Sequence, residues 1–388
     1  MSPIKPDTFA MIERLIAFDT TSRGSNLGLI EWVRDYLRGF GIESRLTYDS
    51  SGKKANLFAT IQESNKPGIV LSGHTDVVPV DGQAWDTDPF KAVIKGDKLY
   101  GRGSCDMKSY IAVALAMTPK FVNAELKAPI HFALSYDEEV GCMGVRGLIA
   151  DLAANGIRPA GAIIGEPTSM QPVIAHKGKR SYRCRVHGKE AHSALTPQGV
   201  NAIEFGARLI THVRQMADRM RDNEPRNAGF DVPFTTLQTG LISGGTATNI
   251  VPAECIFHFE FRYLPGADPD ALEKEIKDYA EKVLVPEMHR TDPHTGITIT
   301  TSSEIPGLNT AEDDKVTYLA QALSRNKSTA KVAYATEGGL FQRAGIPSII
   351  CGPGSIEQAH KPNEYVSLDQ IALCESFMER FLENMCRE

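Results

Sequence analysis

Short apolar runs alternate with stretches of helical periodicity in this chain. Runs of this length, bounded by glycine or proline, predict buried strands. Strands that alternate with helices predict an α/β fold with a mostly parallel mixed sheet. The carboxyl ends of parallel strands share one edge of a sheet, so residues that follow different strands can meet there. The apolar runs are "ANLFATI", "GIVLSG", "PIHFALSY" and "GAIIGEP", with helical patterns such as "GVRGLIADLAANG" between them.

The pattern changes in the middle of the chain. From "KRSYRCRVHG" to "GITITTSS" the order becomes strand, helix, strand, strand, helix, strand. This is the split βαβ arrangement of a small ferredoxin-like α+β domain. Helix, strand and helix patterns return after it. We therefore predict a discontinuous first domain, 1–177 and 306–388, and an inserted second domain, 178–305.

Composition narrows the class of protein. The 388 residues carry a net charge of −6, which argues against a nucleic-acid or anionic-membrane surface. No apolar run is long enough to span a membrane, and the N-terminus lacks the apolar core of a signal peptide, so we expect a cytoplasmic protein. The seven cysteines show no Cys-x-x-Cys spacing, so a thiolate zinc site is not expected. Any bound metal would need histidine and carboxylate ligands.

Metal-type ligands follow the predicted strands at five places. Each place alone has an ordinary structural explanation, such as a solvated loop or a helix cap. Their joint position at strand ends predicts a metal site at one edge of the sheet. The residues are His74 and Asp76 in "GHTDVVP", Asp106 in "GRGSCDMK", Glu138 and Glu139 in "DEEVG", Glu166 in "GEPT" and His360 in "AHKPNEYV".

The ligand types fit a pair of zinc ions. Zinc accepts imidazole nitrogen and carboxylate oxygen, and cobalt or manganese would accept the same ligands. Five ligands suit two ions that share one bridging carboxylate and hold a hydroxide between them. A carboxylate that is not a ligand would take the proton of the water and pass it to the leaving amine. Glu138 and Glu139 could divide these roles, since neighbouring residues on an extended segment point in opposite directions.

These motifs, in this order and with "AHS" in the insert, resemble the co-catalytic zinc aminoacylase and carboxypeptidase family. The resemblance spans nearly the whole chain and implies a zinc-dependent exopeptidase-like catalytic domain. It implies that Asp106 bridges two zinc ions and that Glu138 is the general base and acid. The remaining roles that it implies are His74 and Glu166 on one ion, Glu139 and His360 on the other, and Asp76 as the carboxylate that fixes the tautomer of His74.

The resemblance also covers the insert and implies a homodimer formed through this domain. His192 in "AHS" would reach the active site of the neighbouring subunit and stabilise the oxyanion. Arg262 in "FEFRYLPG" and Asn249 in "GGTATNIVP" would receive the α-carboxylate of the substrate, a planar partner that suits arginine. The alternative for Arg262 is an exposed charge on a strand.

Within the family, "YATEGGLFQRAGIPSIICGPGSIEQAHKPNEYV" is most similar to the acetylornithine deacetylases. This similarity implies removal of the acetyl group from N2-acetyl-L-ornithine, a step of arginine biosynthesis. Glu337 would then pair with the side-chain ammonium, or it would only cap the helix that follows. Gly338 and Gly339 would let the backbone approach the substrate closely.

Other functions stay open at this point. One is succinyl-diaminopimelate desuccinylase or a broader N-acyl-amino-acid deacylase, although no arginine can be assigned to a succinyl carboxylate. Another is a binding protein without catalysis on the same fold, since fold does not dictate function. The presence of Glu138 and of all five metal ligands argues against a binding protein.

Overall fold

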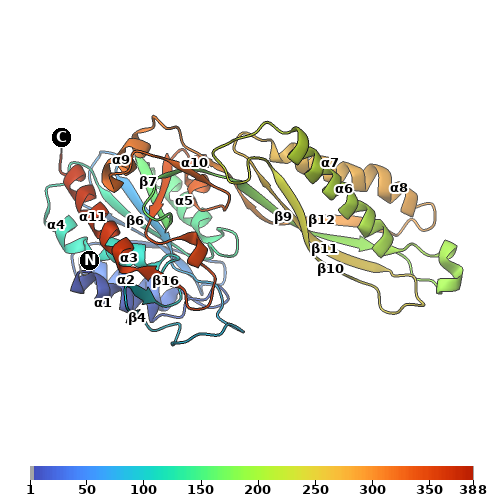
Figure 1. The fold of residues 1–388 in the computed structure, drawn as a ribbon, viewed down its shortest axis with the longest axis horizontal. Helices are drawn as coiled ribbons and strands as arrows, with labels where there is room; N and C mark the ends of the chain where they lie inside the picture. Colours follow the sequence, from blue (N-terminus) through green and yellow to red (C-terminus); the bar gives the residue numbers. More distant parts are fainter. Residues whose placement is uncertain (1–3, 388) are drawn as a thin grey trace. The chain divides into compact units, whose positions relative to one another are not determined.

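The computed structural model describes residues 4–387. Their contacts divide the chain into two compact units, and Figure 1 labels several elements of each. The first unit consists of the residues up to 175, residues 308–331 and the residues from 336 onward. The second unit consists of residues 176–307 and 332–335, and the predicted insert, 178–305, lies inside it.

A mixed sheet of nine strands forms the centre of the first unit (Figure 1). The strand order is β1-β2-β6-β3-β7-β15-β8-β13, and β14 pairs with β8. β3 is parallel to β6 and β7, and β7 is parallel to β15, which confirms the predicted α/β fold. The strands are β1 (Ser44–Tyr48), β2 (Ala55–Ile61), β3 (Ile69–His74), β6 (Ile130–Ser135), β7 (Gly161–Pro167), β8 (Val173–His176), β13 (Leu308–Asn309), β14 (Ala330–Val332) and β15 (Ser348–Gly352).

Helices cover both faces of this sheet, because the central strands are apolar on both sides. Leu57 and Ala59 belong to the core that α1, α2, α3, α4, α9 and α11 close. Phe58, between them, faces the other side, where α5 and α10 contact the sheet. The helices are α1 (Pro6–Ile16), α2 (Leu27–Arg38), α3 (Lys108–Ala116), α4 (Thr118–Asn123), α5 (Gly144–Ala154), α9 (Lys315–Ser324), α10 (Gly338–Arg343), α11 (Leu368–Met385) and the 3₁₀ turn η3 (Ile356–Gln358).

Two details of the first unit differ from the sequence-based expectation. The apolar stretch "SYIAVALAMTPKFV" predicts one buried helix. The chain instead forms two helices, α3 and α4, which meet at Met117, and Pro119 lies in the first turn of α4. A separate three-stranded sheet of β4 (Val93–Lys95), β5 (Lys98–Tyr100) and β16 (Tyr365–Ser367) was not predicted. Between residues 4 and 387, no helix has both the length and the apolar character of a membrane span.

The second unit has the predicted order of elements, β9, α6, β10, β11, α7 and β12. Its sheet is antiparallel in the order β10-β11-β9-β12 (Figure 1). Alternate residues of β9 and β11, such as Tyr182 and Phe259, pack with residues of α6 and α7 in one core. The elements are β9 (Gly178–His187), η1 (Ser193–Gln198), α6 (Ala202–Asn223), β10 (Thr236–Gly244), β11 (Glu254–Tyr263), α7 (Pro269–Tyr279) and β12 (Gly296–Ile305).

The last helix of this unit is less regular than its sequence indicated. The pattern predicted one helix over "DPDALEKEIKDYAEKVL". After α7 the chain instead forms a π-helical turn, η2 (Ala280–Leu284), and then a short helix, α8 (Val285–Met288). Ala280, Leu284 and Met288 remain buried in the core of the unit, so the wider turn keeps these side chains inside.

Candidate metal centre

The topology of the first unit explains why the predicted ligands meet. β6, β3, β7 and β15 are neighbours in the sheet and run parallel, so their carboxyl ends lie at one edge. His74 is the last residue of β3, Glu166 lies near the end of β7, and Glu139 follows β6. Asp106 lies two residues before α3, and His360 lies in the loop between η3 and β16.

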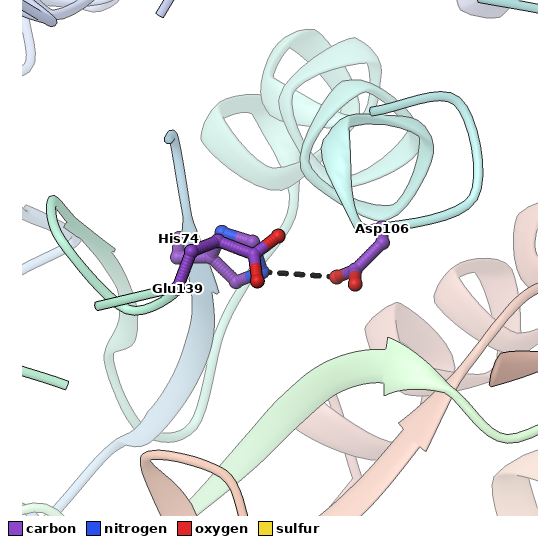
Figure 2. A group of neighbouring side chains, drawn as sticks. All are labelled: His74, Asp106 and Glu139. Carbon is purple, nitrogen blue, oxygen red and sulfur yellow. Dashed lines mark hydrogen bonds and ion pairs between the residues drawn. The ribbon is translucent and has the colours of Figure 1, made fainter. Parts of the chain in front are cut away.

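The carboxylate of Asp106 lies between two histidines. Its Oδ1 is 3.0 Å from Nε2 of His74, and its Oδ2 is 3.4 Å from Nε2 of His360. Nε2 of His74 is also 3.7 Å from Oε1 of Glu166, and Nε2 of His360 is 2.9 Å from Oε2 of Glu139. Figure 2 shows how the side chains of His74, Asp106 and Glu139 converge. The five residues therefore form two halves that share Asp106.

These spacings suit metal coordination. Donor atoms on one tetrahedral zinc ion, with bonds of about 2.0–2.1 Å, lie roughly 3.3 Å apart. The observed contacts between donor atoms range from 2.9 to 3.7 Å. Histidine nitrogen and carboxylate oxygen are also the donor types that zinc accepts. The residues present thus fit a two-ion site with Asp106 as the shared ligand.

The orientation of His74 is fixed by its other ring nitrogen. Nδ1 lies 2.9 Å from the backbone oxygen of Asp76. A carbonyl oxygen only accepts, so Nδ1 donates and the neutral ring keeps a lone pair on Nε2, the atom that faces Asp106. The carboxylate of Asp76, predicted to fix the tautomer, also lies beside Nδ1, at 3.5 Å, and the carbonyl of the same residue is the closer acceptor.

The carboxylate of Asp76 also supports the segment after β6. Its Oδ1 accepts from the backbone N–H of Glu138 at 3.1 Å, and its Oδ2 accepts from that of Glu139 at 3.3 Å. The hydroxyl of Ser22 donates to Oδ2 at 2.8 Å. Asp76 is only 2% exposed, so these bonds satisfy a buried charge. Asp76 therefore positions both glutamates through their backbone.

Glu138 lies beside the same cluster. It offers a carboxylate oxygen within 4.8 Å of donor atoms of His74 and Glu166. Burial, together with the nearby carboxylates of Glu139 and Glu337, raises the pKa of Glu138 to about 8, although the charge of His74 opposes this shift. A carboxyl group with a pKa near neutrality can both take and release a proton at that pH. Its position and its pKa suit proton transfer.

The pKa values of two neighbouring carboxyl groups are raised as well, whereas that of Asp106 is lowered. Burial and the charge of Asp106 raise the pKa of Glu139 to about 7, and burial raises the pKa of Glu166 well above its usual range. Burial disfavours the ionised form of Asp106 as well, but its bonds to His360 and His74 outweigh burial and lower its pKa. Burial among other carboxylates thus disfavours the ionised forms of Glu139 and Glu166, and a divalent cation would favour them.

Glu337, the residue before α10, is buried and only 1% exposed. Its Oε1 accepts a hydrogen bond of 2.5 Å from the hydroxyl of Ser135, the last residue of β6. Its Oε2 has no hydrogen-bond partner among the described residues. Glu337 is the N-cap residue of α10, but its side chain makes no capping bond to that helix. Gly338 and Gly339, next to it, are buried.

Three predicted residues lie in the second unit, so the structure does not place them against the cluster. His192 is exposed, and its Nδ1 accepts from the backbone N–H of Ala194 at 3.1 Å, which leaves Nε2 as the donor of the neutral ring. The backbone oxygen of Asn249 accepts from Ser193, next to His192, at 3.0 Å. Nε of Arg262 donates to Glu260 at 3.2 Å.

Sequence reasoning missed one residue beside the centre. Glu364, four residues after His360, is 1% exposed and receives hydrogen bonds from the loop that carries Asp106. The side chain of Arg102 pairs with it at 2.8 Å. Both residues lie inside quoted motifs, "AHKPNEYV" and "GRGSCDMK". An acidic residue four positions after a predicted ligand was the available signal.

Comparison with known proteins finds a family whose model matches most of the chain. Residues 70–384 match the model of peptidase family M20/M25/M40. The chain is 36% identical over 372 residues to an acetylornithine deacetylase of Proteus mirabilis (strain HI4320), covering 95% of this chain and 93% of the relative. It is 35% identical to an acetylornithine deacetylase of Myxococcus xanthus, covering 100% of this chain and 99% of the relative. The solved structure of an M20 family metallo-carboxypeptidase, Sso-CP2 of Sulfolobus solfataricus, has the same fold, with a TM-score of 0.75 at 18% identity. The match covers 99% of this chain and 100% of that chain.

Proposed function

We propose that this chain, which belongs to peptidase family M20/M25/M40, hydrolyses N2-acetyl-L-ornithine to ornithine and acetate. Membership of the family makes the protein a metal-dependent hydrolase. The relatives from Proteus mirabilis and Myxococcus xanthus, both named acetylornithine deacetylase, support the substrate. The donor set arranged on both sides of Asp106 carries the proposal, because it offers ligands for two ions next to a proton-transfer group.

The roles of the residues follow from their positions. Two bound zinc ions would lower the pKa of a water molecule and polarise the amide carbonyl, and cobalt or manganese would suit the same donors. Glu138 takes the proton of the attacking water and delivers it to the leaving nitrogen. Asp76 holds Glu138 and Glu139 in place. The proposed ligands are Asp106 for both ions, His74 and Glu166 for one, and Glu139 and His360 for the other.

The second unit would supply further contacts to the substrate. The exposed Nε2–H of His192 suits an oxyanion, and Asn249 and Arg262 suit an α-carboxylate. A homodimer would bring His192 to the site of the other subunit. β10 supports such a dimer, because it is an edge strand on which Leu241 is 67% and Ile242 56% exposed.

The amino-acid specificity would come from Glu337. The unpaired Oε2 of Glu337 would accept a hydrogen bond from the side-chain ammonium of the substrate, with Gly338 and Gly339 at its side. The alternatives are a succinyl-diaminopimelate desuccinylase and a broader N-acyl-amino-acid deacylase. Acetate release from a panel of N-acyl amino acids, with and without a chelator, separates them. Full turnover after verified removal of metal would contradict the proposal.

The two adjacent glutamates should differ in what their loss removes. We expect Glu138→Ala to lose about 10²–10⁴-fold in kcat, because proton transfer is lost, while the zinc content stays at two per chain. We expect Glu139→Ala to lose zinc, because a ligand is gone. Elemental analysis and kcat for both variants check this. If Glu138→Ala is the variant without zinc, the roles within the pair are reversed.

Glu337→Gln should separate charged from neutral substrates. It keeps the shape of the side chain and removes its charge, and a buried carboxylate–ammonium hydrogen bond contributes roughly 1.5–3 kcal/mol. We therefore expect kcat/KM for N2-acetylornithine to fall about 10–100-fold, and that for N-acetylmethionine to change much less. The neutral substrate is the control for folding and metal content. An equal fall for both substrates would mean that Glu337 only supports the structure.

His192 should act in the neighbouring subunit. His192→Ala and Glu138→Ala would each be inactive as homodimers, but a heterodimer would contain one intact site. We expect mixed chains to regain activity after subunit exchange, as measured by acetate release. Exchange is verified separately with differently tagged chains. No recovery in verified heterodimers would place His192 in the site of its own chain, or outside catalysis.

A further inference from the structure

We propose that Glu364 is a positioning residue that fixes the loop of Asp106 and the loop of His360 relative to each other. The inference rests on the proposed metal site and assigns a role to a residue that is not a ligand. Glu364 acts together with Arg102 and Gln83. We call these three residues the clamp.

The carboxylate of Glu364 is surrounded by donors of the Asp106 loop. Oε1 accepts from the backbone N–H groups of Cys105 at 2.8 Å and Asp106 at 3.0 Å. Oε2 accepts from the backbone N–H of Gly103 at 3.0 Å and from Nη1 of Arg102 at 2.8 Å. Four N–H donors around two oxygens match the acceptor capacity of a carboxylate. The backbone of Asp106, the shared ligand, is therefore held directly by Glu364.

The same residue holds the His360 loop from its other side. Glu364 is four residues from His360, and its backbone oxygen accepts from Gly101 at 3.1 Å. The side chain of His360 is 55% exposed, so packing alone does not fix the ring. The position of His360 depends on the backbone of its loop, and Glu364 attaches that backbone to residues 101–106.

Arg102 and Gln83 extend these contacts to His360 itself. Nη1 of Arg102 also donates to the backbone oxygen of Lys361 at 3.3 Å, and its Nη2 donates to Oε1 of Gln83 at 2.5 Å. Nε2 of Gln83 donates to the backbone oxygen of His360 at 3.0 Å. The clamp thus joins Asp106 and His360, two ligands that are far apart in sequence, and fixes their loops relative to each other.

The variant Glu364→Gln tests this role. Glutamine has the same length but offers one acceptor oxygen, and its NH₂ group would face N–H donors, so the two loops would lose part of their connection. Residues that orient metal ligands typically contribute 10–100-fold in metal affinity. We expect metal-free Glu364→Gln to bind zinc about 10–100-fold more weakly than the natural protein. The more weakly bound of the two zinc ions should dissociate first.

The measurement is a zinc titration of metal-free protein against a chelating indicator, with circular dichroism to show that each variant is folded. The matched control is Glu357→Gln, an exposed glutamate of η3 just before the His360 loop, which should bind zinc as the natural protein does. Unchanged zinc affinity in folded Glu364→Gln, or an equal loss in Glu357→Gln, would overturn the inference. If the natural protein bound no zinc, the proposed function would fail instead.

A second variant covers the case in which Glu364→Gln does not fold. Gln83→Ala removes the contact to the backbone of His360 and leaves the buried carboxylate intact. We expect it to weaken the binding of one zinc ion and to leave the other near its natural affinity. If Gln83→Ala bound two zinc ions with natural affinity, this result would contradict the proposed role of the clamp.

Discussion

The carboxylate of Asp106 lies between two imidazoles, with one oxygen 3.0 Å from His74 and the other 3.4 Å from His360. This arrangement depends on the topology of the first unit, because the two histidines come from a strand end and a loop that are far apart in sequence. A parallel sheet brings such residues to one edge. Asp76 and Glu364 then fix the segments around them through backbone N–H groups.

The same edge concentrates negative charge in a buried place. Burial raises the pKa of Glu138 to about 8, and those of Glu139 and Glu337 to about 7. Gathering acidic groups where water is largely excluded is unfavourable unless a cation or a proton compensates them. Strongly shifted carboxyl groups are typical of sites with a function rather than of structural cores. The electrostatics and the donor geometry therefore point to the same role.

Sequence reasoning grouped the proposed ligands because two of them, His74 and Glu166, lie at the ends of apolar runs, where the chain leaves the core. It could not locate interactions made by backbone atoms. The acceptor for Nδ1 of His74 is a carbonyl oxygen, which every residue carries, so no side-chain pattern signals it. Glu364 binds N–H groups 258 to 261 residues away, and only the folded chain shows that pairing. The π-helical turn after α7 likewise arises from packing rather than from periodicity.

Anomalous diffraction at the zinc edge, from crystals grown with zinc, tests the central claim most directly. Our account predicts two peaks per chain, roughly 3.5–4 Å apart, with one carboxylate oxygen of Asp106 bonded to each ion. The peak near Glu166 should also contact His74, and the other should contact Glu139 and His360. A single ion, or ions bound away from Asp106, would contradict the account.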